Sequence, residues 1–353
     1  MPLRIWFNKS FSVTHNLLNL IRQGDVGGDF HLLASHSVAT AMARLAADEW
    51  FVEPELSGQE YVDWCLHFCA ENRVDLFIPG KAAINISRRL DEFRQHGVSV
   101  LLCADTDTLV LLDNKAAFSR SVDQADTPTA ETVEVHSLTE FQSAYAAMRT
   151  RHTTLCLKPS VSVFGLGFRV IDETQDALEH VLAGVEQHVN LHELLRAMEG
   201  KPEFRKPSLL LMEFLGGDEW SVDCVAEHGE LVFAVQRRKS TQLSAPQTID
   251  NNADVERMTE ILTRRFGLNG MFNIQFRAGE HGIRVLEINA RPSGGSPVAC
   301  IAGPNLPYEA VLRALDARKQ ADIRARRPTC EPQAVAYGLH IHQTMHPAAL
   351  AHG

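Results

Sequence analysis

The sequence of 353 residues has no uninterrupted apolar run of about 18 residues, the length that a membrane span requires. Its N-terminus has no apolar core long enough for a secretion signal. Positive charge is also scarce, because 34 basic residues face 44 acidic ones and the formal net charge is −10. Nonspecific attraction to polyanions needs the opposite sign. We therefore expect a cytoplasmic protein with no membrane partner and no nucleic-acid partner.

Cysteine is too sparse and too scattered for a disulfide framework. The seven cysteines are an odd number spread over a long chain, which is typical of reduced thiols. Cys65 and Cys69 lie four residues apart on a predicted helix and could share a metal ion. No second pair accompanies them, so we interpret both as small buried hydrophobic residues.

The first third of the chain alternates strand and helix patterns, which predicts an N-terminal parallel α/β domain over residues 1–112. No glycine-rich dinucleotide motif follows the first strand. Asn8-Lys9-Ser10 and Gly80-Lys81 follow strands, so they either open at the ligand-binding edge of the sheet or form turns and caps. The predicted strands are Leu3–Phe7, Phe30–Ala34, Leu76–Pro79 and Val98–Cys103, and the predicted helices are Thr14–Arg22, Val38–Ala47, Tyr61–Asn72 and Ile84–His96.

A second domain is predicted over residues 113–325, with a smaller subdomain at about 128–207. The run Asp113-Asn114-Lys115 is expected to cap a helix that continues to about Asp123, and strands dominate again from Ser208. Residues 172–197 are expected to be helical. The C-terminal segment, residues 326–353, is expected to be a strand at Ala334–His342 followed by a tail.

The segment from Asn273 to Arg291 predicts a two-stranded hairpin with polar residues on one face. Residues two apart on a strand share a face, so Glu287 and Asn289 point the same way, and Gln275 lies nearly opposite on the partner strand. Carboxylate and amide oxygens suit magnesium, which also keeps substrate phosphates in its shell. Arg291 would then reach the terminal phosphate. The alternative is an amphipathic hairpin with a solvated face.

Three further segments combine strand ends with charge or glycine. Lys158 precedes a loop with Gly165 and Gly167, which could surround phosphate oxygens or could be an ordinary turn. Glu213 interrupts an apolar strand that could offer its backbone to a base. The run from Gln236 to Lys239 is either a site or a solvated face.

Taken together, these motifs resemble the ATP-grasp superfamily, most closely the carbamoyl phosphate synthetase and biotin carboxylase type of domain and the amino-acid ligases. The resemblance implies a pre-ATP-grasp α/β domain followed by a two-subdomain ATP-grasp fold. Their order along the chain is Asp113-Asn114-Lys115, Lys158-Pro159 with its glycine loop, Met212-Glu213-Phe214-Leu215 with Glu219, Gln275, and Glu287-Ile288-Asn289-Ala290-Arg291.

The resemblance also implies a role for each residue. Phosphate contacts would come from Lys115, Lys158, Gly165 and Gly167, and contacts to adenine and ribose from Glu213, Phe214, Leu215 and Glu219. Metal ligands would be Gln275, Glu287 and Asn289, and the catalytic cations would be Arg291, Lys158 and Arg238. The phosphate loop is poorer in glycine than is usual in the superfamily.

The activity implied is that of an ATP-dependent carboxylate–amine ligase that works through an acyl phosphate. ATP and Mg²⁺, with Mn²⁺ as an alternative ion, would be its cofactors, and a small carboxylate and an amine its substrates. Specificity is expected at the edge of the N-terminal sheet and in Ser293-Gly294-Gly295-Ser296. A small-molecule kinase and a noncatalytic ATP-binding module are the alternatives. A homodimer is the default assembly.

Overall fold

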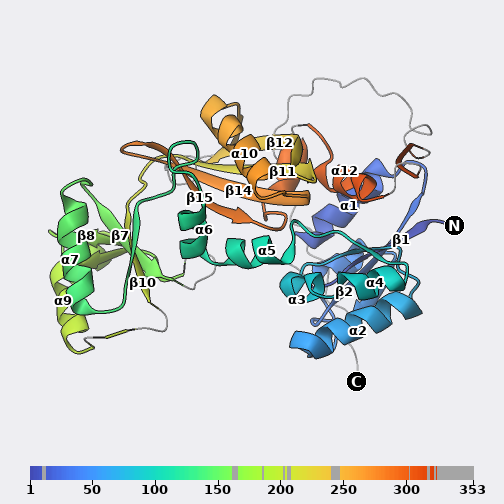
Figure 1. The fold of residues 1–353 in the computed structure, drawn as a ribbon, viewed down its shortest axis with the longest axis horizontal. Coiled ribbons are helices and arrows are strands. Elements are labelled where there is room, and N and C mark those ends of the chain that lie inside the picture. The colour runs from blue at the N-terminus through green and yellow to red at the C-terminus, as the bar shows by residue number, and fades with distance from the viewer. Residues whose placement is uncertain are drawn as a thin grey trace.

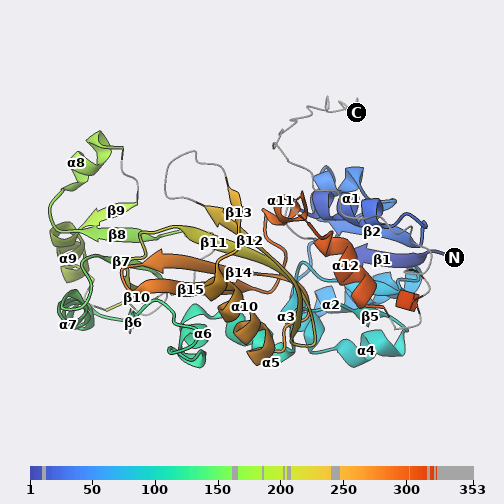
Figure 2. The same ribbon diagram turned by 90° about the horizontal axis from the view of Figure 1, so that it is seen from above.

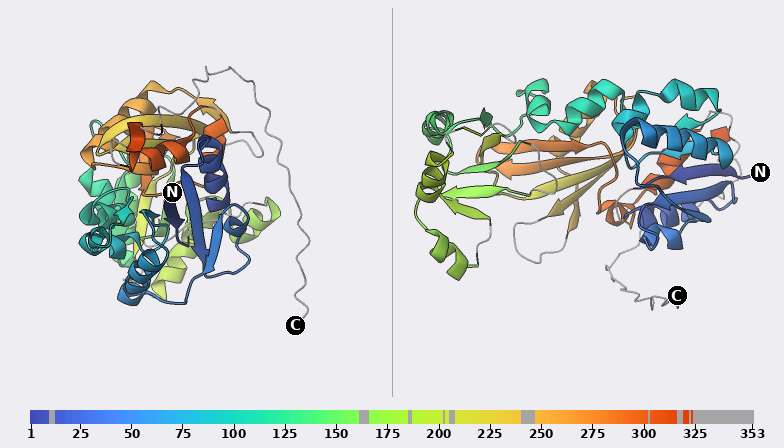
Figure 3. Two further views of the ribbon diagram at one scale, coloured as in Figure 1. Left: turned by 90° about the vertical axis from the view of Figure 1, so that its right-hand side faces the viewer. Right: turned by 90° about the horizontal axis from the view of Figure 1, so that it is seen from below.

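The structure is a computed structural model that describes residues 1–9, 13–160, 166–184, 187–201, 203–204, 208–239, 247–301, 303–315, 319–321 and 323. Three five-stranded sheets lie in a row, with the sheet of the N-terminal residues at one end and the second sheet at the other (Figure 1). The views in Figures 2 and 3 agree on this order. The arrangement confirms an N-terminal parallel α/β part followed by two further sheet-based parts.

The first sheet is parallel, with the strand order β3-β2-β1-β4-β5. Its strands are β1 (Leu3–Phe7), β2 (Phe30–His36), β3 (Glu49–Val52), β4 (Leu76–Ile78) and β5 (Ser99–Val100). Alternate residues of β1 enter different cores: Ile5 and Phe7 pack on one side and Trp6 on the other. Both faces of a parallel sheet are therefore buried, which explains the continuous apolar runs in its strands.

Helices cover both faces of the first sheet. On one side α1 (Thr14–Gly24) packs with α12 (Leu306–Arg313), which returns from the far end of the described chain. On the other side lie α2 (Gly58–Glu71), α3 (Ala83–Ser87) and α4 (Leu90–Gln95). Burial raises the pKa of the Cys65 and Cys69 thiols, and all six cysteines among the described residues are free.

The second sheet is mixed, with the order β6-β10-β7-β8-β9. Its strands are β6 (Thr132–Val135), β7 (Leu155–Pro159), β8 (Arg169–Asp172), β9 (His188–Asn190) and β10 (Leu209–Glu213). The helices α7 (Leu138–Arg149) and α9 (Leu191–Glu199) cover one face, where Leu157 and Leu211 are buried. By strand parity Lys158, which pairs with Leu210, lies on the other face. Figure 2 shows α8 (Ala177–Leu182) at the outer end of this sheet.

The third sheet is antiparallel and lies between the other two, with the order β13-β12-β11-β14-β15. Its strands are β11 (Glu219–Glu227), β12 (Glu230–Lys239), β13 (Thr248–Asp250), β14 (Gly270–Gly279) and β15 (Gly282–Asn289). The helices α5 (Thr106–Asp113), α6 (Lys115–Ser121) and α10 (Ala253–Arg265) contribute to the core on one face, and α11 (Ser296–Ile301) follows β15. The opposite face carries polar residues, among them Ser221, Asp223 and Gln275, together with the apolar residues Val225 and Val235.

Three predicted helices were wrong in extent. Residues 38–47 form only the short 3-10 helix η1 (Met42–Leu45), and the edge strand β3 after it was missed. The helix predicted at 84–96 is two helices, because Arg89 has a non-helical backbone. The helix predicted at 172–197 is interrupted by β9, which pairs with β8. Asp176 and Asn190 cap separate helices there, so local capping and strand pairing override the helical spacing.

Two further expectations concern a C-terminal strand and membrane-spanning segments. The predicted C-terminal strand at 334–342 lies outside the described residues. Within the part that the structure describes, no helix combines the length and apolar character needed to cross a membrane.

The contact between α1 and α12 leaves no room for a side chain at Gly24. A Cβ atom there would lie 2.4 Å from Cγ of Tyr308, which is buried. We predict that Gly24→Ala lowers the free energy of unfolding by about 1–3 kcal/mol, measured by urea denaturation, because it overpacks this contact. Gly303→Ala is the control, since a Cβ atom there meets nothing within 4 Å. Equal stabilities of the two variants would contradict the packing described.

Candidate nucleotide and metal site

The hairpin of β14 and β15 brings four oxygen-bearing side chains together. Gln275 pairs with Glu287, and two residues along each strand Asn273 pairs with Asn289. A β-bulge after Gln275 shifts the register beyond this point. The two pairs share one face by strand parity, while Ile274 and Ile288 point into the core on the other.

Two lysines from different segments lie beside Glu287. Lys115 is the first residue of α6, where the Asn114 side chain accepts a hydrogen bond from Ala117 N at 3.0 Å and caps the helix. Its Nζ lies 3.1 Å from Glu287 Oε2. Lys158 reaches the same region from β7, and both lysines line a cavity of about 20 Å³ between the second and third sheets. The site therefore forms only where α6, β7 and β15 meet.

The charges of this cluster act on one another. Burial lowers the pKa of Lys158, and the neighbouring Lys115 cation lowers it further. Burial alone would raise the pKa of Glu287, but attraction to Lys115 and the hydrogen bond from Asn289 outweigh it, so that pKa lies below its usual value. Glu287 is consequently an anion at neutral pH.

The donor set fits a hard divalent cation. Glu287 offers a carboxylate, and Gln275 and Asn289 offer amide oxygens, the ligand types that Mg²⁺ and Mn²⁺ prefer. The Asn289 amide nitrogen donates to Glu287 Oε1 at 3.1 Å. Across the ladder from Asn289, the buried Oδ1 of Asn273 accepts no hydrogen bond from any described residue. An acceptor in that position is suited to a cation or to a water molecule that the cation holds.

Arg291 follows β15 by two residues and lies beside the cluster. Burial lowers its pKa, and the Glu287 carboxylate opposes that shift. Its Nη1 donates to the carbonyl oxygen of Pro292 at 3.3 Å. The guanidinium is thus partly removed from water and close enough to the Glu287 carboxylate to interact with it.

Behind these residues lies a buried polar network centred on Asp223. Its Oδ1 accepts hydrogen bonds from Ser293 Oγ at 2.8 Å and Ser296 Oγ at 2.6 Å, and Asn273 Nδ2 lies 3.3 Å away. Its Oδ2 accepts from Arg237 Nε at 2.7 Å. The carboxylate therefore ties the loop after Arg291 to β11, β12 and β14. Sequence reasoning missed it, although polar residues alternate along β11 at 219, 221 and 223.

The two neighbouring arginines of β12 lie on opposite faces of the third sheet. Arg237 pairs with Ser221, which pairs with Gln275, so it shares the face of the metal ligands. Arg238 pairs with Trp220, whose ring is in the helix-covered core, and lies 3.7 Å from Asp218 and 3.8 Å from Asp250. The structure thus does not bring Arg238 to the predicted site.

Glu213, predicted at the nucleotide base, is buried and fully engaged. Arg284 Nε lies 3.2 Å from its Oε1, and the backbone N–H of Glu131 donates to its Oε2 at 3.2 Å. His152 Nε2 lies 3.8 Å from the same Oε2. Its main chain is engaged as well, since its N–H donates to Glu131 O at 3.0 Å and its carbonyl oxygen accepts from Cys156 Sγ at 3.6 Å. Glu213 therefore holds β10 against the hairpin.

The other residues predicted around the nucleotide follow β7, follow β10 or begin β11. The Phe214 ring lies 6.5 Å from that of Phe168, centroid to centroid, and Leu215 is buried. Glu219 pairs with Lys239 at 2.7 Å. Gly167 has φ +81° and lies close to Pro159, while Gly165 lies outside the described residues.

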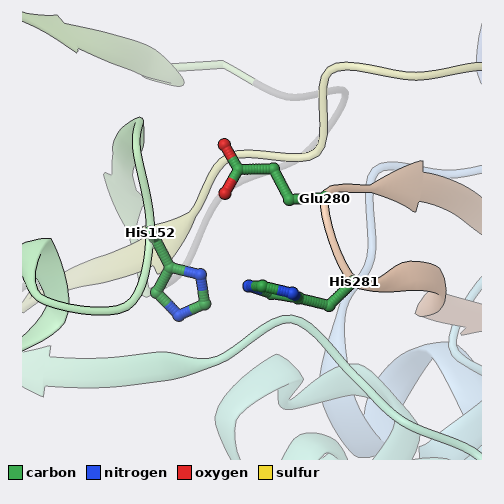
Figure 4. Close-up of side chains that lie close together, drawn as sticks. All are labelled: His152, Glu280 and His281. Atoms are coloured by element: carbon green, nitrogen blue, oxygen red, sulfur yellow. The ribbon is translucent and has the colours of Figure 1, made fainter.

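A separate polar group joins the hairpin tip to the second sheet. Figure 4 shows His152, Glu280 and His281 close together, and their ligand atoms all lie within 4.8 Å of one another. The residue types are those that zinc accepts. However, Glu280 already accepts a hydrogen bond from Thr153 Oγ1, and His152 Nε2 lies 2.7 Å from Glu131 Oε2. The group thereby fastens the tip of the hairpin to the loop before β7.

Comparison with known proteins identifies the fold. Residues 205–336 match the family model "ATP-grasp in the biosynthetic pathway with Ter operon". Among solved structures, the biotin carboxylase domain of Hydrogenobacter thermophilus 2-oxoglutarate carboxylase, in complex with MgADP, ADP and bicarbonate, is 14% identical with a TM-score of 0.60, covering 89% of this chain and 70% of that one.

Two further solved structures give the same result. Staphylococcus aureus N5-carboxyaminoimidazole synthetase complexed with ADP is 11% identical with a TM-score of 0.58, covering 83% of this chain and 72% of that one. Campylobacter jejuni biotin carboxylase is 13% identical with a TM-score of 0.60, with coverages of 90% and 72%. These likenesses and the family match show that the chain has an ATP-grasp fold, which confirms the resemblance inferred from the motifs.

The Asp223 network yields a prediction about stability. We expect Asp223→Ala to lower the free energy of unfolding by about 3–5 kcal/mol, because it leaves the Arg237 guanidinium buried without its counter-ion. Urea denaturation measures the change. Asp91→Ala is the control, since Asp91 pairs with Arg94 at 2.7 Å on the exposed surface and should contribute little. A loss no greater than that of the control would show that the buried pair does not stabilise the fold.

Proposed function

We propose that this ATP-grasp chain is an ATP-dependent carboxylate–amine ligase that releases ADP and phosphate. The observation that carries the proposal is the convergence of Lys115 and Lys158 on Glu287, in the cleft between the second and third sheets. Two cations beside a carboxylate and two amides suit a polyphosphate held with a divalent ion. The ADP complexes of proteins with this fold support the same use of the cleft.

In this proposal the phosphates lie against Lys115 and Lys158, and Gln275, Glu287 and Asn289 hold Mg²⁺. The ion supplies positive charge to phosphate oxygens when it is bound. Phe214 and Leu215 flank the base, and Glu219 lies on the ribose side. The proposal assigns no step to Arg238, because its side chain lies on the other face of the sheet.

The reaction needs no protein nucleophile. A carboxylate oxygen attacks the γ-phosphorus of ATP, and the bond to the β–γ bridging oxygen breaks, which yields an acyl phosphate and ADP. An amine nitrogen then attacks the acyl carbon, loses a proton and displaces inorganic phosphate. Lys158 and Arg291 stabilise the charge on the phosphoryl group during transfer, so the protein acts mainly by positioning and electrostatics.

Two other functions use the same nucleotide site. A small-molecule kinase would release a stable phosphorylated product, and a noncatalytic module would bind ATP without forming ADP. Mass spectrometry of reactions with paired acids and amines separates these outcomes from an amide. Formation of AMP and pyrophosphate would instead show adenylation and would overturn the acyl phosphate.

Arg291 offers the sharpest single-residue test. We predict that Arg291→Ala lowers turnover by about 10²–10³-fold, equivalent to roughly 2.7–4 kcal/mol of transition-state stabilisation, while nucleotide binding persists. ADP release under saturating ATP and isothermal titration with ADP measure the two properties.

The matched control for this test is Arg257→Ala, which removes an equally charged side chain from α10 on the outer face of the third sheet. It should keep the wild-type rate. If Arg291→Ala turns over at the rate of the control with nucleotide bound, Arg291 has no part in phosphoryl transfer.

A further inference from the structure

A second cavity, of about 70 Å³, lies between the first sheet and the third. Phe7 and Ile78 line it from the carboxyl ends of β1 and β4, which is the edge where open parallel sheets bind ligands. Leu17 of α1 and Ala310 of α12 contribute further walls. The cavity therefore lies at the junction of the two parts that α12 fastens together.

This cavity adjoins the proposed site through the chain itself. Ala290, Arg291 and Pro292 line it, and they directly follow the metal-binding position Asn289. Arg291 also interacts with the Glu287 carboxylate. One residue thus borders both the cluster that would hold the phosphates and the cavity beside it.

The lining combines apolar walls with a single charge. Among the described residues that line the cavity, Arg291 is the only one with an ionisable charged side chain. The Asn269 amide is directed to the main chain, because its Oδ1 accepts from His228 N at 3.3 Å and its Nδ2 donates to Leu102 O at 3.4 Å. Such a lining suits a molecule with one anionic end and an apolar remainder.

The volume limits the size of that apolar part. A cavity of about 150 Å³ binds benzene, and this cavity has about half that volume. We therefore expect its occupant to be smaller than an aromatic ring, such as a branched aliphatic group of about three or four carbons. The sign of the charge matters equally, because the Arg291 guanidinium attracts a carboxylate and repels an ammonium group.

We propose that the cavity binds the aliphatic chain of the carboxylate substrate, and that this substrate is a short, branched aliphatic acid whose carboxylate lies beside Arg291. The inference rests on the proposed ligase function and names its acid. The carboxylate would then meet the phosphoryl group at the residue that the site and the cavity share. Each buried methylene favours binding about fourfold, so kcat/KM should rise steeply with the number of carbons of the acid that the cavity buries.

The test uses the full chain with ATP, Mg²⁺ and hydroxylamine, a small amine that converts an acyl phosphate to a hydroxamate. Acetate, propionate, isobutyrate, isovalerate, succinate and benzoate are compared by hydroxamate formation and ADP release. We expect kcat/KM for isovalerate to exceed that for acetate at least tenfold, and succinate and benzoate to react poorly.

Two variants change the cavity in opposite directions. Ala310→Leu fills it and should lower kcat/KM for isovalerate at least tenfold relative to kcat/KM for acetate, a ratio that a general loosening of the α12 contacts would not change. Leu17→Ala enlarges it and should shift the preference to longer acids. Ala314→Leu, one turn farther along the chain from Ala310 and outside the lining, is the control for disturbance of that region. Circular dichroism checks that each variant folds, and Leu17→Ala gives an independent result if Ala310→Leu does not.

The possible failures are distinguishable. If nucleotide binds but neither these acids nor the wider screen of paired acids and amines yields ADP, the proposed ligase function fails and the inference fails with it. If the wider screen yields an amide while none of these acids reacts, only the assignment of the cavity is overturned. If succinate or acetate reacts best, or if both cavity variants keep the wild-type order of acids, the assignment of the cavity is overturned while the ligase function stands.

Discussion

The site depends on one buried carboxylate. Asp223 is fully buried, and a carboxylate without water must be paired and hydrogen bonded or it destabilises the fold. Its partners come from β12, β14 and the loop after β15, so satisfying it fixes how these segments meet. Gly295 permits the closeness, because a Cβ atom there would lie 2.3 Å from Arg237 Nη1. Arg291 is held in place by a loop whose conformation Asp223 determines.

Around this fixed centre, the charged groups come from parts of the chain that could move independently. Lys158 belongs to the second sheet, Lys115 to the helix after the first part, and Glu287 to the third sheet. The 3.1 Å contact between Lys115 and Glu287, and the cavity that both lysines line, show that the three parts approach closely in the described conformation. The hairpin tip makes a second connection to the second sheet, because Glu280 accepts a hydrogen bond from Thr153 in the loop before β7. The second and third sheets are thus connected at the hairpin tip, in addition to the charged cluster around Glu287.

Much of this fold follows from the sequence, because strand parity and capping are local. The pairing of Gln275 with Glu287 could be predicted from the hairpin pattern, and Asn114 marks the start of α6. The same parity separates Arg237 from Arg238, but choosing the correct face requires the register with β11, which only the tertiary structure supplies. The return of α12 to the first sheet joins residues nearly 300 positions apart and leaves no local pattern. The strand β9 was missed because its three residues pair only in the folded sheet.

The helix α12 has a consequence for how this protein can change. Tyr308, Val311 and Leu312 belong to the core of the first sheet, while Leu306 and Ala310 pack against the third. The same eight-residue helix also supplies wall to the cavity beside Arg291. Mutations in α12 that reshape this wall will therefore also disturb the packing of the first sheet against the third. Selection for a different ligand should proceed more readily through Pro79 and Gly80 after β4, which line the same cavity and belong to none of these apolar cores.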